Sequence, residues 1–132
     1  MTEAVEDSSP MRSFVEQVQH SAGLSSFEES DALVRATLKT LAEAVTGGQI
    51  DDLAEGLPQE LRNELTRRSG QARSMDKDGF LDRVSGAVET TDLDRTERYV
   101  RAVLQTVRAW VPEGETSNTM KQLPSSLVAL FD

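Results

Sequence analysis

The residues of this chain that could do chemistry are few, and they do not combine into a complete catalytic or metal-binding motif. The sequence has no cysteine and one histidine, His20. This composition excludes thiol nucleophiles, disulfides, and metal sites built from thiolates or from several imidazoles. A Ser-His-Asp arrangement would have to run through His20, and no serine or aspartate is tied to it by spacing. We therefore expect a protein that is not an enzyme, with no catalytic residues, no cofactor and no metal.

The segment Asp76–Phe80 carries the D-x-D-G pattern of part of a calcium-binding loop. In the register of such a loop, Ser74 would stand in place of the first carboxylate ligand and Ser85 in place of the bidentate glutamate. Two essential ligands are therefore missing. We predict instead that Asp78 is the N-cap of a helix.

Two adjacent pairs of carboxylates, Glu28-Glu29 and Asp51-Asp52, could in principle act as acid and base. Neither pair is repeated elsewhere in the chain, and charge runs of this kind are typical of solvated helix starts. An enzyme that uses carboxylates alone is therefore a weakly supported hypothesis.

The chain is acidic, with 23 Asp and Glu against 14 Lys and Arg and a formal net charge of −9. This balance argues against bulk nucleic-acid binding, because affinity for phosphates comes from lysine and arginine. The local exception is a basic stretch in the middle of the chain, between Arg62 and Lys77, that includes Arg67, Arg68 and Arg73. An anionic partner could dock there, although a solvated hinge is the favoured interpretation.

The elements that must position these residues come in two copies. A shift of the sequence by 66 residues, without gaps, aligns mostly apolar residues with identical ones, so a folding pattern is repeated rather than a reactive group. Residues related by this shift are called counterparts below. The identical counterparts are Phe14/Phe80, Val18/Val84, Val34-Arg35-Ala36/Val100-Arg101-Ala102, Leu38/Leu104, Thr40/Thr106, Val45/Val111, Gly48/Gly114, Leu57-Pro58/Leu123-Pro124 and Leu61/Leu127.

Trp110 breaks this symmetry, because its counterpart is Ala44. Tryptophan is enriched at protein interfaces, so Trp110 joins Arg67, Arg68 and Arg73 as a possible partner contact. The favoured interpretation places its ring in the interior or between the two halves, and Tyr99 is expected in the core.

Apolar spacing predicts one long helix in each half, through Val34–Val45 and Val100–Val111. A shorter helix precedes each long one, and a short segment and a Leu-Pro helix follow it. No stretch shows period-two alternation, so we predict an all-α fold, a single domain of two similar four-helix halves packed as a helical bundle. The expected organisation is a disordered tail at 1–10, a first repeat at 11–68, a linker at 69–77 and a second repeat at 78–132.

Capping signals mark the ends of the two long helices. We expect serine or aspartate N-caps at their starts and glycine or proline at their ends. The residues are Ser25-x-x-Glu28 and Gly47-Gly48 for the first helix, and Asp92 or Asp94 and Pro112 with Gly114 for the second.

Together these motifs resemble a bacterial family catalogued as domain of unknown function 2267. Its pattern is an F-x-x-x-V helix, a long V-L-x-x-L helix, a glycine turn and a Q-L-P-x-x-L segment, and the unit occurs twice. The chain departs from the pattern at Gly56, where the family usually has glutamine. The resemblance covers the chain from about residue 11 and implies an all-helical fold, with no activity, ligand or catalytic residue attached to it. The matching pieces are Phe14/Val18, Leu38/Leu41, Gly47-Gly48 and Leu57-Pro58/Leu61, then Phe80/Val84, Leu104/Val107, Gly114-Glu115 and Gln122-Leu123-Pro124/Leu127.

The repeated packing residues and the lack of reactive groups favour a non-enzymatic interaction or adaptor module, a monomer or weak homodimer with an unknown protein partner. The alternative is a small-molecule binder or carrier with a pocket between the repeats. The sequence has no apolar run of about 18 residues that could span a membrane. Its N-terminus lacks the basic-then-apolar order of a secretion signal, so we expect a cytoplasmic protein.

Overall fold

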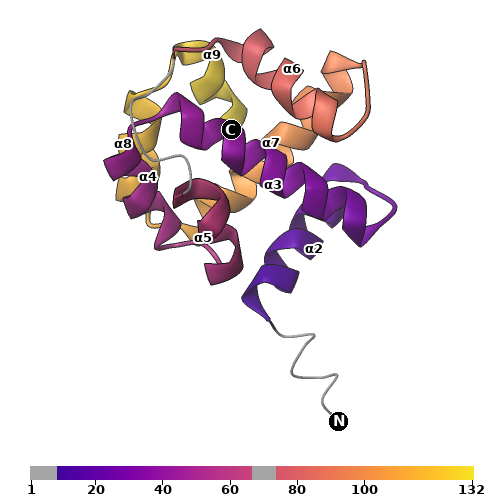
Figure 1. Ribbon diagram of the computed structural model, residues 1–132, viewed down its shortest axis with the longest axis horizontal. Helices are drawn as coiled ribbons and strands as arrows, with labels where there is room; N and C mark the ends of the chain where they lie inside the picture. Colours follow the sequence, from indigo (N-terminus) through magenta and orange to yellow (C-terminus); the bar gives the residue numbers. More distant parts are fainter. Residues whose placement is uncertain (1–8, 67–73) are drawn as a thin grey trace.

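The computed structural model describes residues 9–66 and 74–132, and this part of the chain is helical without any strand (Figure 1). The predicted all-α class is therefore confirmed. Residues 1–8 of the expected tail, and Arg67, Arg68 and Arg73, lie outside the described residues. The elements in chain order are α2 (Pro10–Ala22), α3 (Phe27–Ala44), α4 (Gly47–Ala54), α5 (Gln59–Thr66), α6 (Lys77–Ala87), α7 (Leu93–Trp110), α8 (Glu113–Lys121), α9 (Ser125–Val128) and the 3₁₀ helix η1 (Ala129–Phe131).

The helices of the two halves pack across each other in reciprocal pairs. Helix α2 of the first half packs on α7 of the second, and α6 of the second half packs on α3 of the first. Helices α3 and α7 contact each other, and so do α4 and α8. In Figure 1, α3 crosses the middle of the molecule with α2 and α6 on either side, while α4 and α8 lie together at one edge. The common origin of the halves by duplication stays a prediction.

The core is one apolar cluster to which both halves contribute. The repeated aromatic residues are buried, with Phe14 0% and Phe80 1% exposed, and so are Leu57 and Leu123 of the two Leu-Pro segments. Within the described ranges the only large hydrophobic side chain on the surface is Leu93, which is 39% exposed. None of the described helices combines the length and the apolar character needed to cross a bilayer.

The cap of α3 lies one residue later than predicted. Ser26, not Ser25, is the N-cap, and its hydroxyl accepts a hydrogen bond from the Glu29 N–H at 3.1 Å. The Glu29 carboxylate in turn accepts hydrogen bonds from the hydroxyls of Ser25 and Ser26. Glu29 therefore replaces Glu28 in the capping box, because only this register lets one carboxylate serve both serines. On α7 the predicted Asp92 cap is confirmed, with the Arg95 N–H donating to its carboxylate at 3.2 Å.

Gly47 and Gly48 begin α4 instead of ending α3 as predicted. Helix α3 ends at Ala44 because Val45 has extended backbone, and Thr46 is the N-cap of α4, accepting from the Gln49 N–H. The matching Pro112 takes the N-cap position of α8, with Gly114 inside that helix. The sequence pattern located these boundaries but assigned the glycines to the wrong helix.

The N-cap of α6 is Asp76, so the prediction for Asp78 was wrong. The Asp76 side chain accepts a hydrogen bond from the Gly79 N–H at 2.8 Å, while Asp78 lies exposed in the first turn. Because the helix begins at Lys77, the residue directly before it is Asp76, and Asp78 supports the helix dipole from within the first turn instead.

Counterpart ion pairs lie on the two long helices, Asp31 with Arg35 on α3 and Glu97 with Arg101 on α7. In the second pair Glu97 is also bound by Lys77 of α6 at 3.2 Å, so it joins two helices. The hydrogen bond from Arg101, followed by that from Lys77, lowers the pKa of Glu97 below its usual value. The charged form of Glu97 is therefore the form that stabilises the fold.

We expect Glu97→Gln to lower the free energy of unfolding at pH 7 by up to about 1 kcal/mol, because a partly exposed ion pair is screened by solvent. A carboxylate with a lowered pKa contributes stability above its unfolded-state pKa, and the contribution is lost as pH falls through the folded-state pKa. The difference between wild type and variant should therefore shrink below about pH 4. Urea denaturation between pH 3 and pH 7 measures it, with Asp82→Asn on the exposed face of α6 as the matched control. A difference in the free energy of unfolding that stays constant down to pH 3 would contradict the stabilising role of the charged form of Glu97.

Candidate functional site

Trp110 lies between the two halves. Its ring meets the buried ring of Phe14 edge-on, with the centroids 5.3 Å apart, and its indole N–H donates to Gln17 Oε1 at 3.1 Å. Phe14 and Gln17 belong to α2, so one side chain of α7 is fixed by the other half through both packing and a hydrogen bond. This position agrees with the favoured interpretation of Trp110 as a residue between the halves.

The described residues of the basic stretch are engaged within the protein. The Arg62 guanidinium donates to the carbonyl oxygens of Ala54 at 3.0 Å and Glu55 at 3.1 Å, at the end of α4. Lys77 pairs with Glu97. His20 lies exposed in the last turn of α2. In residues 9–66 and 74–132 no group of three histidines or carboxylates could hold a metal ion.

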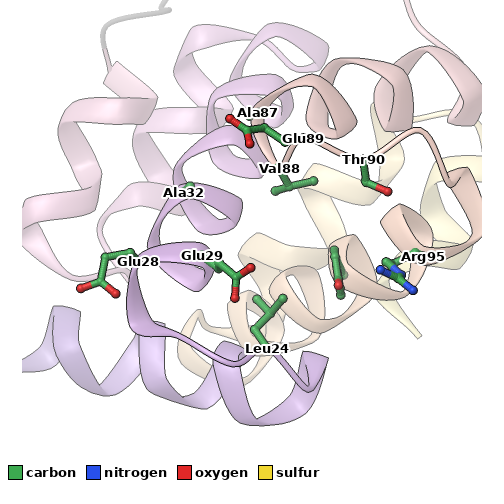
Figure 2. Close-up of a pocket in the computed structure, with 10 residues that line it drawn as sticks. Leu24, Glu28, Glu29, Ala32, Ala87, Val88, Glu89, Thr90 and Arg95 are labelled. Atoms are coloured by element: carbon green, nitrogen blue, oxygen red, sulfur yellow. The ribbon is translucent and has the colours of Figure 1, made fainter.

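A pocket of about 430 Å³ opens where the two halves meet. Its walls come from the turn between α2 and α3, the first turns of α3, the end of α6, the turn that follows α6, and the start of α7 (Figure 2). The lining combines four aliphatic side chains with one aromatic ring and several polar groups. The residues are Leu24, Glu28, Glu29, Ala32, Ala87, Val88, Glu89, Thr90, Arg95 and Tyr99.

Counterparts line this pocket from opposite sides. Leu24 is the counterpart of Thr90, and Glu29 is the counterpart of Arg95. Figure 2 shows Glu29 and Arg95 on opposite sides of the pocket, with Leu24 on a third side and Val88 and Thr90 across from it. The same place in the two halves thus carries unlike residues, which gives the pocket a negative side and a positive side.

The pocket is bordered by two helix ends of the same kind. Helix α2 ends at Gly23, which has φ 72°, and the Leu24 N–H donates back to the Gln19 carbonyl. Helix α6 ends through Glu89, with φ 55°, and the Thr90 N–H donates to the Ser85 carbonyl in the same way. A left-handed residue is required at both ends, and glycine adopts it without strain. Glu89 is thus a strained residue that lines the pocket.

We expect Glu89→Gly to raise the free energy of unfolding by about 0.5–1 kcal/mol, because it removes the steric cost of a side chain at positive φ. The matched control is Gly23→Ala, where a Cβ would meet nothing within 4 Å. That control isolates the backbone strain and should lower the free energy of unfolding by about 1 kcal/mol. Urea denaturation of both variants checks the pair. A loss of stability in Glu89→Gly would contradict this expectation. It would show that contacts of the glutamate side chain stabilise the fold by more than the positive φ destabilises it.

Glu29 presents a fixed carboxylate to the pocket. Its Oε1 atom accepts hydrogen bonds from Ser25 Oγ at 2.9 Å and Ser26 Oγ at 3.3 Å. The Ser25 hydroxyl is the main cause that lowers the pKa of Glu29, so the group is ionised at neutral pH. An ionised carboxylate has two acceptor oxygens, and in the described part of the chain Oε2 has no partner. One oxygen thus positions the group, and the other keeps its capacity to accept hydrogen bonds.

Arg95 and Tyr99 complete the polar side of the pocket from α7. The Arg95 side chain is exposed, and among the residues described its guanidinium is in no ion pair. Tyr99 was predicted to be a core residue, but it is only half-buried, packs against the core and lines the pocket. Its counterpart Leu33 is fully buried, so the two halves differ at this position.

This set of groups combines hydrogen-bond donors and acceptors, charges of both signs and an apolar surface. The lining has no cysteine, histidine or lysine, and it shows no nucleophile paired with a base. The sequence pattern indicates Glu29 only as half of a carboxylate pair and Tyr99 only as a core residue, and it does not single out Arg95 or Thr90. The 66-residue shift pairs Leu24 with Thr90 and Glu29 with Arg95, but it does not show that these pairs lie near each other in the fold.

The described residues form an all-helical protein with a pocket where its two halves meet. The chain belongs to the family described as "Uncharacterized conserved protein (DUF2267)", whose model matches residues 11–130. No curated protein matches the chain.

Proposed function

We propose that this protein binds a small molecule in the pocket between its halves. The observation that carries the proposal is the pocket itself, which has about 430 Å³ and combines aliphatic side chains with charged and polar groups from both halves. This volume lies within the range of small-molecule sites, which commonly span about 300–1,000 Å³. The strained Glu89 at its edge further supports a functional role, because strain of this kind gathers at ligand sites.

The adaptor hypothesis receives less support. Interfaces between proteins have an apolar centre with aromatic anchors. The large apolar side chains of the described residues are buried except Leu93, and Trp110 is held between the halves. We therefore propose that the protein binds a metabolite. We further propose that it is a monomer or weak homodimer in the cytoplasm, and cell fractionation tests its location.

A variant that fills the pocket tests the proposal. Ala32→Trp places a large ring into the pocket from the exposed face of α3, and Ala109→Trp, on the exposed face of α7 away from the pocket, is the matched control. The probes are amine, carboxylate and alcohol fragments of about 6–12 heavy atoms, and binding is followed by amide chemical shifts.

We expect fragments to shift the amides of Leu24, Thr90 and Tyr99 in the wild type and in Ala109→Trp, and not in Ala32→Trp. Thermal unfolding of both variants shows that each is folded. Fragment shifts that are scattered over the surface, or that survive in Ala32→Trp, would overturn the proposal.

A further inference from the structure

The pocket between the halves has two charged groups that do not neutralise each other. Glu29 and Arg95 line it from opposite sides, and no ion pair joins them in the described part of the chain. Ion pairs within 4.0 Å are formed by other carboxylates on the same helices, such as Glu97 with Arg101. The separation of Glu29 from Arg95 is thus a feature of the pocket, and a bound molecule can contact both.

The rest of the lining includes an aliphatic surface. Leu24 and Val88 lie on the two remaining sides of the pocket, and Ala32 and Ala87 contribute small side chains. Small side chains leave room for a ligand, and the aliphatic surface favours a hydrocarbon segment over a polar one.

Resting on the proposed function, we infer that the ligand is an ω-amino carboxylate: an extended molecule with an ammonium group at one end, a carboxylate at the other and a hydrocarbon chain between them. The ammonium binds Glu29 Oε2, and the carboxylate binds the Arg95 guanidinium, whose paired N–H donors match a carboxylate in geometry. The hydrocarbon segment lies against Leu24 and Val88.

The other charged residues of the pocket define the main competing possibility. Glu28 and Glu89 also line it, so carboxylates outnumber the single guanidinium. A pocket that recognised charge alone would bind a simple amine best. Figure 2 shows Glu28 pointing away from the pocket and Glu89 near Ala87 and Val88, so Glu29 is the carboxylate on the side opposite Arg95.

Three kinds of probe separate these possibilities. The first is the series 4-aminobutanoate, 6-aminohexanoate and 8-aminooctanoate, the second is hexylamine and the third is hexanoate. Each is titrated into the full chain, and Kd is measured from the amide shifts of Glu29, Thr90 and Arg95. We expect the best member of the series to bind at least about threefold more tightly than hexylamine and hexanoate, as an exposed charge pair contributes up to about fivefold.

Two charge-removing variants assign each end of the ligand. Glu29→Gln keeps a residue that suits the capping box and should weaken the amino carboxylate and hexylamine about threefold to fivefold while sparing hexanoate. Arg95→Gln should weaken the amino carboxylate and hexanoate while sparing hexylamine. The matched control Arg98→Gln removes the same charge from an exposed position of α7 outside the pocket lining and should change no Kd by more than about a factor of two.

The inference is overturned if hexylamine or hexanoate binds as tightly as every amino carboxylate, or if both variants weaken all probes equally. Fragments that still shift the pocket amides in that case leave the proposed function standing. If fragment binding were lost as well, both this inference and the proposed function would be overturned.

Discussion

Replacing Phe14 with alanine should lower the free energy of unfolding by about 3–5 kcal/mol, the range for deleting a buried aromatic side chain. Phe14 is 0% exposed, and its ring contacts Trp110 edge-on at 5.3 Å. The substitution therefore removes core contacts within the first half and also the aromatic contact that joins α2 to α7. Urea denaturation followed by circular dichroism measures the loss.

Its counterpart Phe80 supplies the control. Phe80→Ala should be similarly costly, since Phe80 is 1% exposed, but the counterpart of Trp110 is Ala44, so no tryptophan stands in the equivalent place. The emission of folded Trp110 should change in Phe14→Ala and stay unchanged in Phe80→Ala. Phe14→Leu, which keeps most of the core volume, provides a variant that folds. Unchanged emission in both Phe14 variants would contradict the contact between the rings.

Gly56→Gln should be the most damaging single change outside the core, with a loss of about 3 kcal/mol in the free energy of unfolding. A Cβ at Gly56 would lie 2.9 Å from Val111 Cα and 3.2 Å from Pro112 Cδ. The first of these atoms belongs to the backbone, so the turn between α4 and α5 would have to move. Gly56→Ala introduces the same clash without the rest of the side chain and should cost about 1–2 kcal/mol.

The second half explains why glutamine is absent here although the family pattern has it. The counterpart of Gly56 is Gln122, whose Oε1 accepts from the Thr46 N–H at 2.8 Å and whose Nε2 donates to Thr46 Oγ1 at 3.1 Å. The counterpart of Thr46 is Pro112, which has neither an N–H nor a hydroxyl. A glutamine at 56 would thus find no partner, and glycine lets Pro112 pack closely instead.

The pairing of residue types can be tested by a double variant. Gly56→Gln combined with Pro112→Thr recreates the Gln122–Thr46 arrangement in the other half. The double variant should lose less free energy of unfolding than the two single variants lose together, by about 1 kcal/mol or more. Gly48→Ala, where a Cβ would meet nothing within 4 Å in helix α4, is the control and should be neutral or stabilising. Additive losses in the double variant would refute this explanation.

Much of the fold could be predicted from the sequence because it depends on apolar spacing. The i, i+4 and i, i+3 positions through Val34–Val45 and Val100–Val111 face the core as expected. Helix boundaries were less predictable, since Ser25 and Ser26, or Asp76 and Asp78, offer chemically similar caps and only the three-dimensional register selects one. Gly47 looked like a helix end because the sequence does not show that Thr46 caps a new helix immediately.

The pocket could not be predicted, because it depends on how the halves are placed relative to each other. Glu29 and Arg95 are far apart in sequence and belong to different helices, and nothing in local periodicity brings them to one cavity. The packing of α2 on α7 and of α6 on α3 does so. Tyr99 shows the same limit, since helical spacing places it on the core side while tertiary packing leaves its ring at the pocket.

The reciprocal packing of the halves also has a consequence for synthesis on the ribosome. Helix α2 is completed early, but the helix that it packs against, α7, is translated only after α6 has been made. The apolar side chains of α2 and α3 that meet the second half therefore stay uncovered while the nascent chain grows. The two halves can pack together only late in translation. Until then the first half exposes hydrophobic surface of the kind that chaperones bind.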